Sequence, residues 1–101
     1  MCEQMKLLRA GLDERKIPWQ DQSEDGICPM ERTKFEINGF SWSVIHGYGS
    51  YGGFFPGSRD AGLLEVMTSA YNGGDPVGWL MAGQVLQMID ELQEENHAKV
   101  Y

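Results

Sequence analysis

The sequence predicts an α+β domain, in which an N-terminal and a C-terminal helix pack on one face of a three- to four-stranded, mainly antiparallel sheet. Two observations carry this prediction. A stripe of apolar residues at helical spacing lies near each end of the chain, and two alternating segments flank Asn38-Gly39. The length of 101 residues fits one domain, which we expect to cover residues 1–95 and to leave residues 96–101 as a flexible tail.

The first helix is expected over residues 2–16. Apolar residues recur on one face there, at Met1, Met5, Leu8 and Leu12. Pro18 ends this helix because it lacks a backbone N–H and disfavours the helical conformation for the residue before it. Residues 17–20 are then expected to form a short strand. Residues 21–31 follow with the acidic, glycine- and proline-containing composition of a loop.

Asn38-Gly39 predicts a β-hairpin with a type I′ turn, because both turn positions require a positive φ. Residues 33–37 and 40–46 alternate between apolar and polar side chains on either side of this turn. The two-residue turn gives three residue pairs on the apolar face of the ribbon, namely Ile37 with Phe40, Phe35 with Trp42, and Thr33 with Val44. Turn type and alternation therefore support the same hairpin.

The region after the hairpin begins with six glycines among residues 47–62, a density that excludes a regular element. Residues 63–68 alternate again and predict a further strand, and a turn follows at Asn72-Gly73-Gly74. This strand completes the predicted sheet.

The last helix is expected to start at Asp75-Pro76, with a carboxylate as N-cap and proline at the first helical position. Its buried stripe consists of Val85, Leu86, Ile89 and Leu92. Two glycines weaken its first turns, so we expect a kink or break between Met81 and Gly83. The helix should fray after Glu95.

The net charge of −7 restricts the classes of partner. Residues 1–59 contribute 7 − 8 = −1, whereas residues 60–101 contribute 1 − 7 = −6. Such a surface repels phosphate backbones, which argues against direct nucleic-acid binding. The acidity serves either solubility or attraction to a protein partner with a basic surface. The chain has no apolar run long enough for a bilayer and its first residues show no signal-peptide pattern. We therefore expect a cytoplasmic protein with reduced thiols and no membrane partner.

Residues 47–52 match the spacing of a nucleotide-binding glycine loop. However, Gly53-Phe54-Phe55-Pro56 follows instead of the helix that such a loop opens. Because aromatic rings alternate with the glycines, the segment suits an ordered crossover, a protein contact or a nucleotide-type ligand contact. The candidate ligand-binding residues are Trp42, Tyr48, Gly49, Tyr51, Gly52 and Arg59.

Cys28, His46 and Asp60 are the residue types of a nucleophile, a base and an orienting acid, but nothing in the sequence brings them together. The chain has no Cys-x-x-Cys or His-x-x-x-His spacing, and His46 and His97 stand in separate elements. We therefore expect no catalytic set, no metal site and no cofactor.

The outward side of the last helix carries a run of carboxylates, at Asp90, Glu91, Glu94 and Glu95. They form either a solvated face or an acidic strip that docks in a basic groove. Phe54 and Phe55 are hard to bury within a domain of this size. These six are the candidate protein-binding residues, and we expect a two-fold homodimer to cover the two phenylalanines.

The run Phe40-Ser-Trp-Ser-Val-Ile-His-Gly-Tyr-Gly-Ser-Tyr-Gly-Gly53, with the length and acidity of the chain, resembles the small acidic orphan proteins of bacterial phages and prophages. Many such proteins counter bacterial immunity. The resemblance implies a non-catalytic inhibitor or regulator that contacts a defence protein through the acidic face and the glycine- and aromatic-rich loop. The alternative is a sponge for nucleotide signals built on residues 47–53. A small hydrolase that uses Cys28 and His46 is the third hypothesis.

Overall fold

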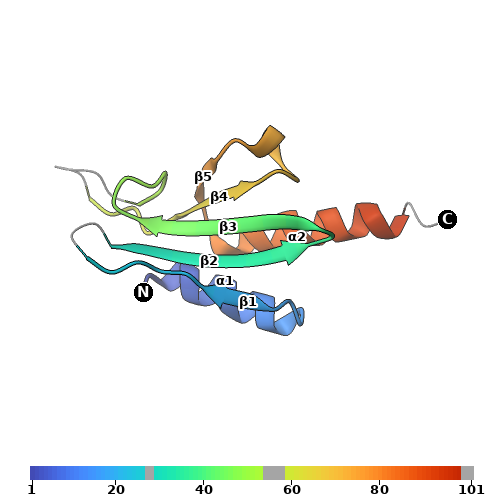
Figure 1. Ribbon diagram of the computed structural model, residues 1–101, viewed down its shortest axis with the longest axis horizontal. Coiled ribbons are helices and arrows are strands. Elements are labelled where there is room, and N and C mark those ends of the chain that lie inside the picture. Colours follow the sequence, from blue (N-terminus) through green and yellow to red (C-terminus); the bar gives the residue numbers. More distant parts are fainter. Residues whose placement is uncertain (27–28, 54–58, 99–101) are drawn as a thin grey trace.

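The computed structural model describes residues 1–26, 29–53 and 59–98, whose arrangement is shown in Figure 1. Two helices and a five-stranded antiparallel sheet of order β1-β2-β3-β4-β5 confirm the α+β class. The elements are α1 (Glu3–Glu14), β1 (Trp19–Asp21), β2 (Met30–Ile37), β3 (Phe40–Gly47), β4 (Leu64–Thr68), the 3-10 turn η1 (Asn72–Gly74), β5 (Val77–Leu80) and α2 (Ala82–Ala98). Within the described ranges, neither helix has the length and apolar character needed to span a bilayer.

The β2–β3 hairpin forms as predicted. Asn38 and Gly39 have φ values of 52° and 84°, as a type I′ turn requires. All three predicted pairs are present: Ile37 with Phe40, Phe35 with Trp42, and Thr33 with Val44. The ladder then continues beyond the predicted strands until Met30 lies opposite Gly47. Met30 and Glu31, which were predicted to end a loop, therefore belong to β2.

The core lies between the sheet and the two helices, which run side by side behind the strands in Figure 1. Trp42 and Val44 of β3 are fully buried there, and Phe35 stacks on Trp42 with 5.7 Å between ring centroids. The helices contribute Met5, Leu8, Leu12, Ala82, Val85, Met88 and Ile89. The apolar stripes predicted from helical spacing thus form one side of the core, except that Met1 is exposed and that Leu86 and Leu92 are only partly buried.

Two predictions are wrong: the number of strands and the start of the last helix. Residues 77–80 form the fifth strand, and α2 begins at Ala82 rather than at Asp75-Pro76. The expected break between Met81 and Gly83 is the true start of the helix. Pairing of residues 77–80 with β4 explains the difference, and within this strand Trp79 has a φ of 61°, which a right-handed helix does not allow. The first strand also differs slightly, since it covers Trp19–Asp21 instead of residues 17–20.

Glutamine side chains satisfy the first N–H groups of α2. Met81 N–H donates to Oε1 of Gln84 at 2.7 Å, an arrangement that forms half of a capping box. Ala82 N–H donates to Oε1 of Gln4 in α1, also at 2.7 Å. The helix runs to Ala98, beyond the residue where fraying was expected, and its last turns extend past the hairpin turn in Figure 1. Residues 99–101 of the expected tail lie outside the described residues.

Candidate functional site

Trp79 is a large apolar side chain that the fold leaves in solvent. It exposes 57% of its surface on β5, an edge strand of the sheet. Met81, two residues further along the chain, exposes 53%. Tryptophan is among the residue types that most often dominate the binding energy of a protein interface.

A β-bulge sets the position of Trp79. Leu64 and Val66 of β4 pair with Leu80 and Val77, so Gly78 and Trp79 together lie opposite one residue of β4. The left-handed conformation of Trp79 costs a non-glycine residue about 1–2 kcal/mol. Strained positions of this kind cluster at functional surfaces, and bulges redirect side chains there.

The glycine-rich loop, residues 47–53, lies against this bulge. Trp79 N–H donates to the carbonyl oxygen of Tyr51 at 3.2 Å. A β-carbon at Gly78 would lie 2.1 Å from the β-carbon of Tyr51, so only glycine allows this approach. Tyr51 itself exposes 52% of its surface. We call Tyr51, Trp79 and Met81 together the aromatic edge.

The backbone of the loop is hydrogen-bonded inward. The N–H groups of Ser50 and Gly53 donate to carbonyl oxygens of the loop, and Gly47 N–H donates to Oγ of Ser50. Tyr51 N–H donates to the buried carboxylate of Glu65 at 3.1 Å. A phosphate cradle needs such N–H groups directed at the ligand, and a carboxylate beneath the loop opposes an anion. This arrangement disfavours a nucleotide site at residues 47–53.

The other predicted ligand-binding residues differ in their exposure. Trp42 is fully buried, so its ring cannot stack on a ligand, which corrects that prediction. Gly49 and Gly52 adopt positive φ within the loop, and Tyr48 is partly exposed beside them. Arg59 is exposed, but it follows residues 54–58, which lie outside the described residues. The predicted protein-binding residues Phe54 and Phe55 fall in that segment.

The predicted acidic strip is only partly directed at solvent. The carboxylate of Asp90 accepts two hydrogen bonds of 2.8 Å from the guanidinium of Arg15, which joins α2 to α1 and lowers the pKa of Asp90. Glu91 and Glu94 are exposed on α2. The side chain of Glu95 lies outside the described residues. Glu91 and Glu94 therefore remain as the strip that a partner could meet.

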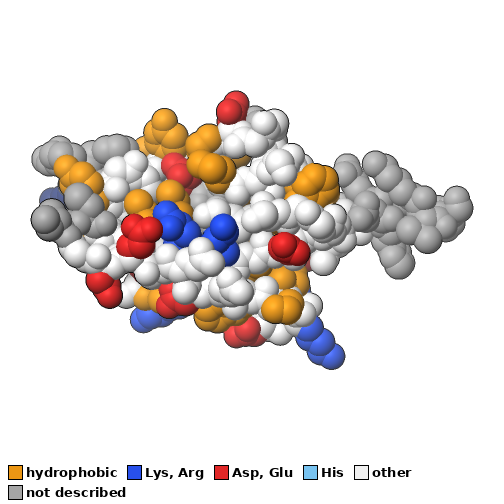
Figure 2. All heavy atoms as spheres, in the orientation of Figure 1, with side chains coloured by type: hydrophobic (Ala, Val, Ile, Leu, Met, Phe, Trp, Pro, Cys, Tyr) orange, Lys and Arg blue, Asp and Glu red, His pale blue; other side chains and the backbone are white. Residues whose placement is uncertain are grey.

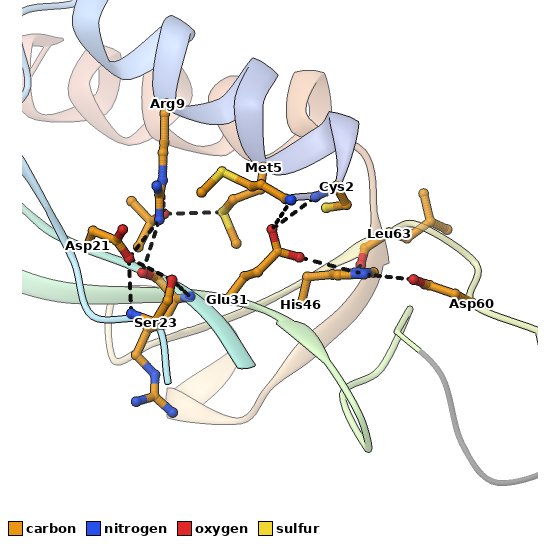
Figure 3. Close-up of polar contacts among 12 residues, drawn as sticks. Cys2, Met5, Arg9, Asp21, Ser23, Glu31, His46, Asp60 and Leu63 are labelled. Carbon is orange, nitrogen blue, oxygen red and sulfur yellow. Dashed lines mark hydrogen bonds and ion pairs between the residues drawn. The ribbon is translucent and has the colours of Figure 1, made fainter. Parts of the chain in front are cut away.

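A second cluster of polar side chains joins three elements and the segment before β4 (Figure 3). Glu31 of β2 lies opposite His46 of β3, and Cys2 stands at the N-cap of α1. The Cys2 sulfur, one Glu31 oxygen and one His46 ring nitrogen lie within 4.8 Å of one another. Nε2 of His46 is 3.1 Å from Oδ2 of Asp60, and Nδ1 is 2.8 Å from the carbonyl oxygen of Leu63. Cys2, Glu31, His46 and Asp60 are called the cysteine–histidine cluster below.

Cys2 is not activated as a nucleophile by this cluster. Burial is the main cause of a raised pKa for its thiol, and the carboxylates of Glu31 and Asp60 raise the pKa further, against the opposing effect of the Met5 N–H. A protonated thiol is a poor nucleophile. Of the three residues that the sequence suggested for catalysis, His46 and Asp60 are brought together, whereas Cys28 lies outside the described residues.

Glu31 and Cys2 were not among the site residues predicted from the sequence, although a signal for Glu31 was present. The hairpin register that pairs Ile37 with Phe40 places Glu31 opposite His46 when it is continued along both strands. The acidic composition of residues 21–31 concealed this continuation because it is typical of a loop. Cys2 reaches the cluster through the packing of α1, which no local pattern specifies.

The face of the sheet away from the helices is polar, and basic side chains gather near its centre (Figure 2). Arg32 and Lys34 line a hollow of about 330 Å³ there, together with Ile45 and Met67. Arg32 also forms an ion pair with Glu24. This mixed lining favours no particular ligand class.

Comparisons with family models, with curated proteins and with solved structures found no match to the chain.

Proposed function

We propose that the chain is a non-catalytic binding module that regulates a protein with a basic surface, and that it contacts this partner through the aromatic edge. One observation carries the proposal. Trp79 is held in a strained left-handed conformation on an edge strand, where its side chain is exposed and its backbone N–H donates to the carbonyl oxygen of Tyr51. Inhibition of a bacterial defence protein is the form of regulation that the phage resemblance suggests.

The conformational cost of Trp79 and the apolar surface that it exposes favour contact with a partner protein. Its conformation costs about 1–2 kcal/mol, a cost that glycine at the same position would remove. Transfer of its exposed surface into an interface would contribute roughly 3 kcal/mol. The conformation is thus unfavourable in the free chain, and contact with a partner offsets it.

The charge of the chain supports a basic partner. The net charge is −7, and three arginines, Arg9, Arg15 and Arg32, already have carboxylate partners within the chain. Glu91 and Glu94 are exposed on α2. Charges of this kind accelerate the encounter with a basic surface, while an aromatic contact slows dissociation.

Trp79→Gly is the variant that separates binding from folding. Glycine favours a φ of 61°, so we expect the melting temperature to stay equal or to rise. Retention of the partner in a quantitative affinity capture should fall at least tenfold if Trp79 is a hot spot, since this corresponds to a loss of about 1.4 kcal/mol or more. Phe40→Ser is the matched control, because Phe40 is an exposed ring on the hairpin turn outside the aromatic edge.

A double charge-reversal variant tests whether the acidic side chains of α2 contribute to partner binding. Glu91→Lys combined with Glu94→Lys should weaken capture at low salt and have little effect at high salt, where exposed charges are screened.

Equal capture by wild type and Trp79→Gly would contradict the aromatic edge as the contact surface. Capture of only a second copy of the chain would also overturn the proposal, because the edge would then be a dimer surface.

A further inference from the structure

We propose that the cysteine–histidine cluster binds one zinc-class divalent metal ion, held by Cys2, Glu31, His46 and Asp60. The ion would tie the start of α1 to β2, β3 and the segment before β4. This inference is independent of the aromatic edge, which lies on other elements of the fold.

The hydrogen bonds of His46 carry the inference. The carbonyl oxygen of Leu63 can only accept, so Nδ1 at 2.8 Å carries a hydrogen, and Nε2 is the ring nitrogen left to bind a metal ion. Nε2 faces the carboxylate of Asp60 at 3.1 Å and that of Glu31 at 4.0 Å, both of which are oxygen donors to a cation. A carbonyl acceptor on the far ring nitrogen is also the arrangement that orients metal-binding histidines.

The spacing of the donor atoms is close to that of a tetrahedral zinc site. Zinc bond lengths to nitrogen, oxygen and sulfur imply separations of about 3.4–3.6 Å between neighbouring ligand atoms. The distances from Nε2 of His46 to the two carboxylate oxygens, 3.1 and 4.0 Å, lie on either side of this range. The Cys2 sulfur lies within 4.8 Å of the Glu31 and His46 donor atoms, whereas Asp60 is outside this group of three and is placed by its contact with His46, so its carboxylate must approach the other donors when an ion binds.

The donor types select the class of metal. A sulfur and an imidazole nitrogen favour zinc and related transition metals over Mg²⁺ and Ca²⁺, which take oxygen ligands. Two carboxylates and a thiolate supply three negative charges, so the ligand set more than neutralises a divalent cation. His46 is 3% exposed, whereas the Asp60 side chain is 45% exposed, so an ion can enter from the side of Asp60.

The raised pKa of the Cys2 thiol predicts that metal binding is coupled to proton release. Burial and the two carboxylates raise the pKa of Cys2 in the chain alone. A divalent cation between these groups would neutralise the carboxylates and deprotonate the sulfur, so binding should release a proton.

Titration of the tag-free chain with Co²⁺ and Zn²⁺ tests the site. We expect one ion per chain, a cobalt spectrum with thiolate-to-metal charge-transfer absorption, and a rise in melting temperature with Zn²⁺ but not with Mg²⁺. Cys2→Ser should abolish the charge-transfer band. Asp60→Asn, at an exposed position, should weaken zinc affinity at least tenfold without unfolding the chain.

Matched controls keep the test decisive. Cys28→Ser changes the other cysteine and should retain the band, and Glu36→Gln changes an exposed carboxylate of β2 and should retain the affinity. Absence of stoichiometric binding would overturn the proposal. A cobalt spectrum without the thiolate band, or loss of the band in Cys28→Ser rather than in Cys2→Ser, would also overturn it.

Discussion

Arg9 is a charged side chain that the fold buries by giving its guanidinium several partners. It is 8% exposed, and its Nε donates to Oγ1 of Thr33 at 2.8 Å. The same group donates to Asp21 and lies 4.6 Å from the ring centroid of Trp19 (Figure 3 shows the polar contacts). The side chain therefore joins α1 to both β1 and β2.

Replacement of Arg9 by lysine should lower the free energy of unfolding by about 2 kcal/mol. A lysine keeps the charge but cannot form the fork of hydrogen bonds or the flat contact with Trp19. Arg15→Lys is the matched control on the same helix and should cost less than about 1 kcal/mol, because the Arg15–Asp90 pair is solvent-exposed. Denaturant unfolding of both variants measures the difference, and equal losses would contradict this account of Arg9.

Individual residues also show what could and could not be predicted from the sequence. His46 and Asp60 were recognised as chemically interesting types, and the structure brings them within 3.1 Å. Trp79 was missed because no sequence pattern distinguishes it. Its unusual feature is its backbone conformation. A positive φ at a tryptophan depends on the partner strand and the loop around it, and residue type alone predicts the opposite.

The elements were predictable where local signals agreed. The hairpin was found because the Asn38-Gly39 turn and the alternation of both strands specify the same register. The last helix was placed too early because Asp75-Pro76 is a strong local start signal. Pairing with β4 overrides that signal, and the helix starts instead where Gln84 can accept the Met81 N–H. Long-range pairing of this kind cannot be obtained from local propensity.

The attachment of β1 to α1 should weaken in acid. Hydrogen bonds from Ser23, reinforced by Arg9, lower the pKa of Asp21 from 3.8 to about 2. Because the folded pKa is depressed, the stabilisation is fully present above pH 4 and is lost as the pH falls through about 2. Thermal unfolding of wild type and Asp21→Asn between pH 5 and pH 2 should therefore show a difference in melting temperature that shrinks with acidity. A constant difference across this range would contradict the prediction.

For the molecule as a whole, the sequence predicts a homodimer that covers Phe54 and Phe55, which lie outside the described residues. Light scattering should then give about twice the chain mass of 11.4 kDa, and Phe54→Ser with Phe55→Ser should halve that mass. Trp79→Gly should leave the mass unchanged if the aromatic edge serves a different partner. A monomer at high concentration would disprove the dimer and leave the aromatic edge unaffected.

Amide hydrogen exchange of the chain, alone and with its captured partner, tests the proposed contact surface most directly. Exchange slows where binding orders or covers backbone groups. We predict slower exchange at residues 48–53 and 77–81 in the complex, with no change at the hairpin turn of residues 38–39. Slowing confined to the helices or to the face of the sheet that carries Arg32 and Lys34 would contradict the aromatic edge as the binding surface.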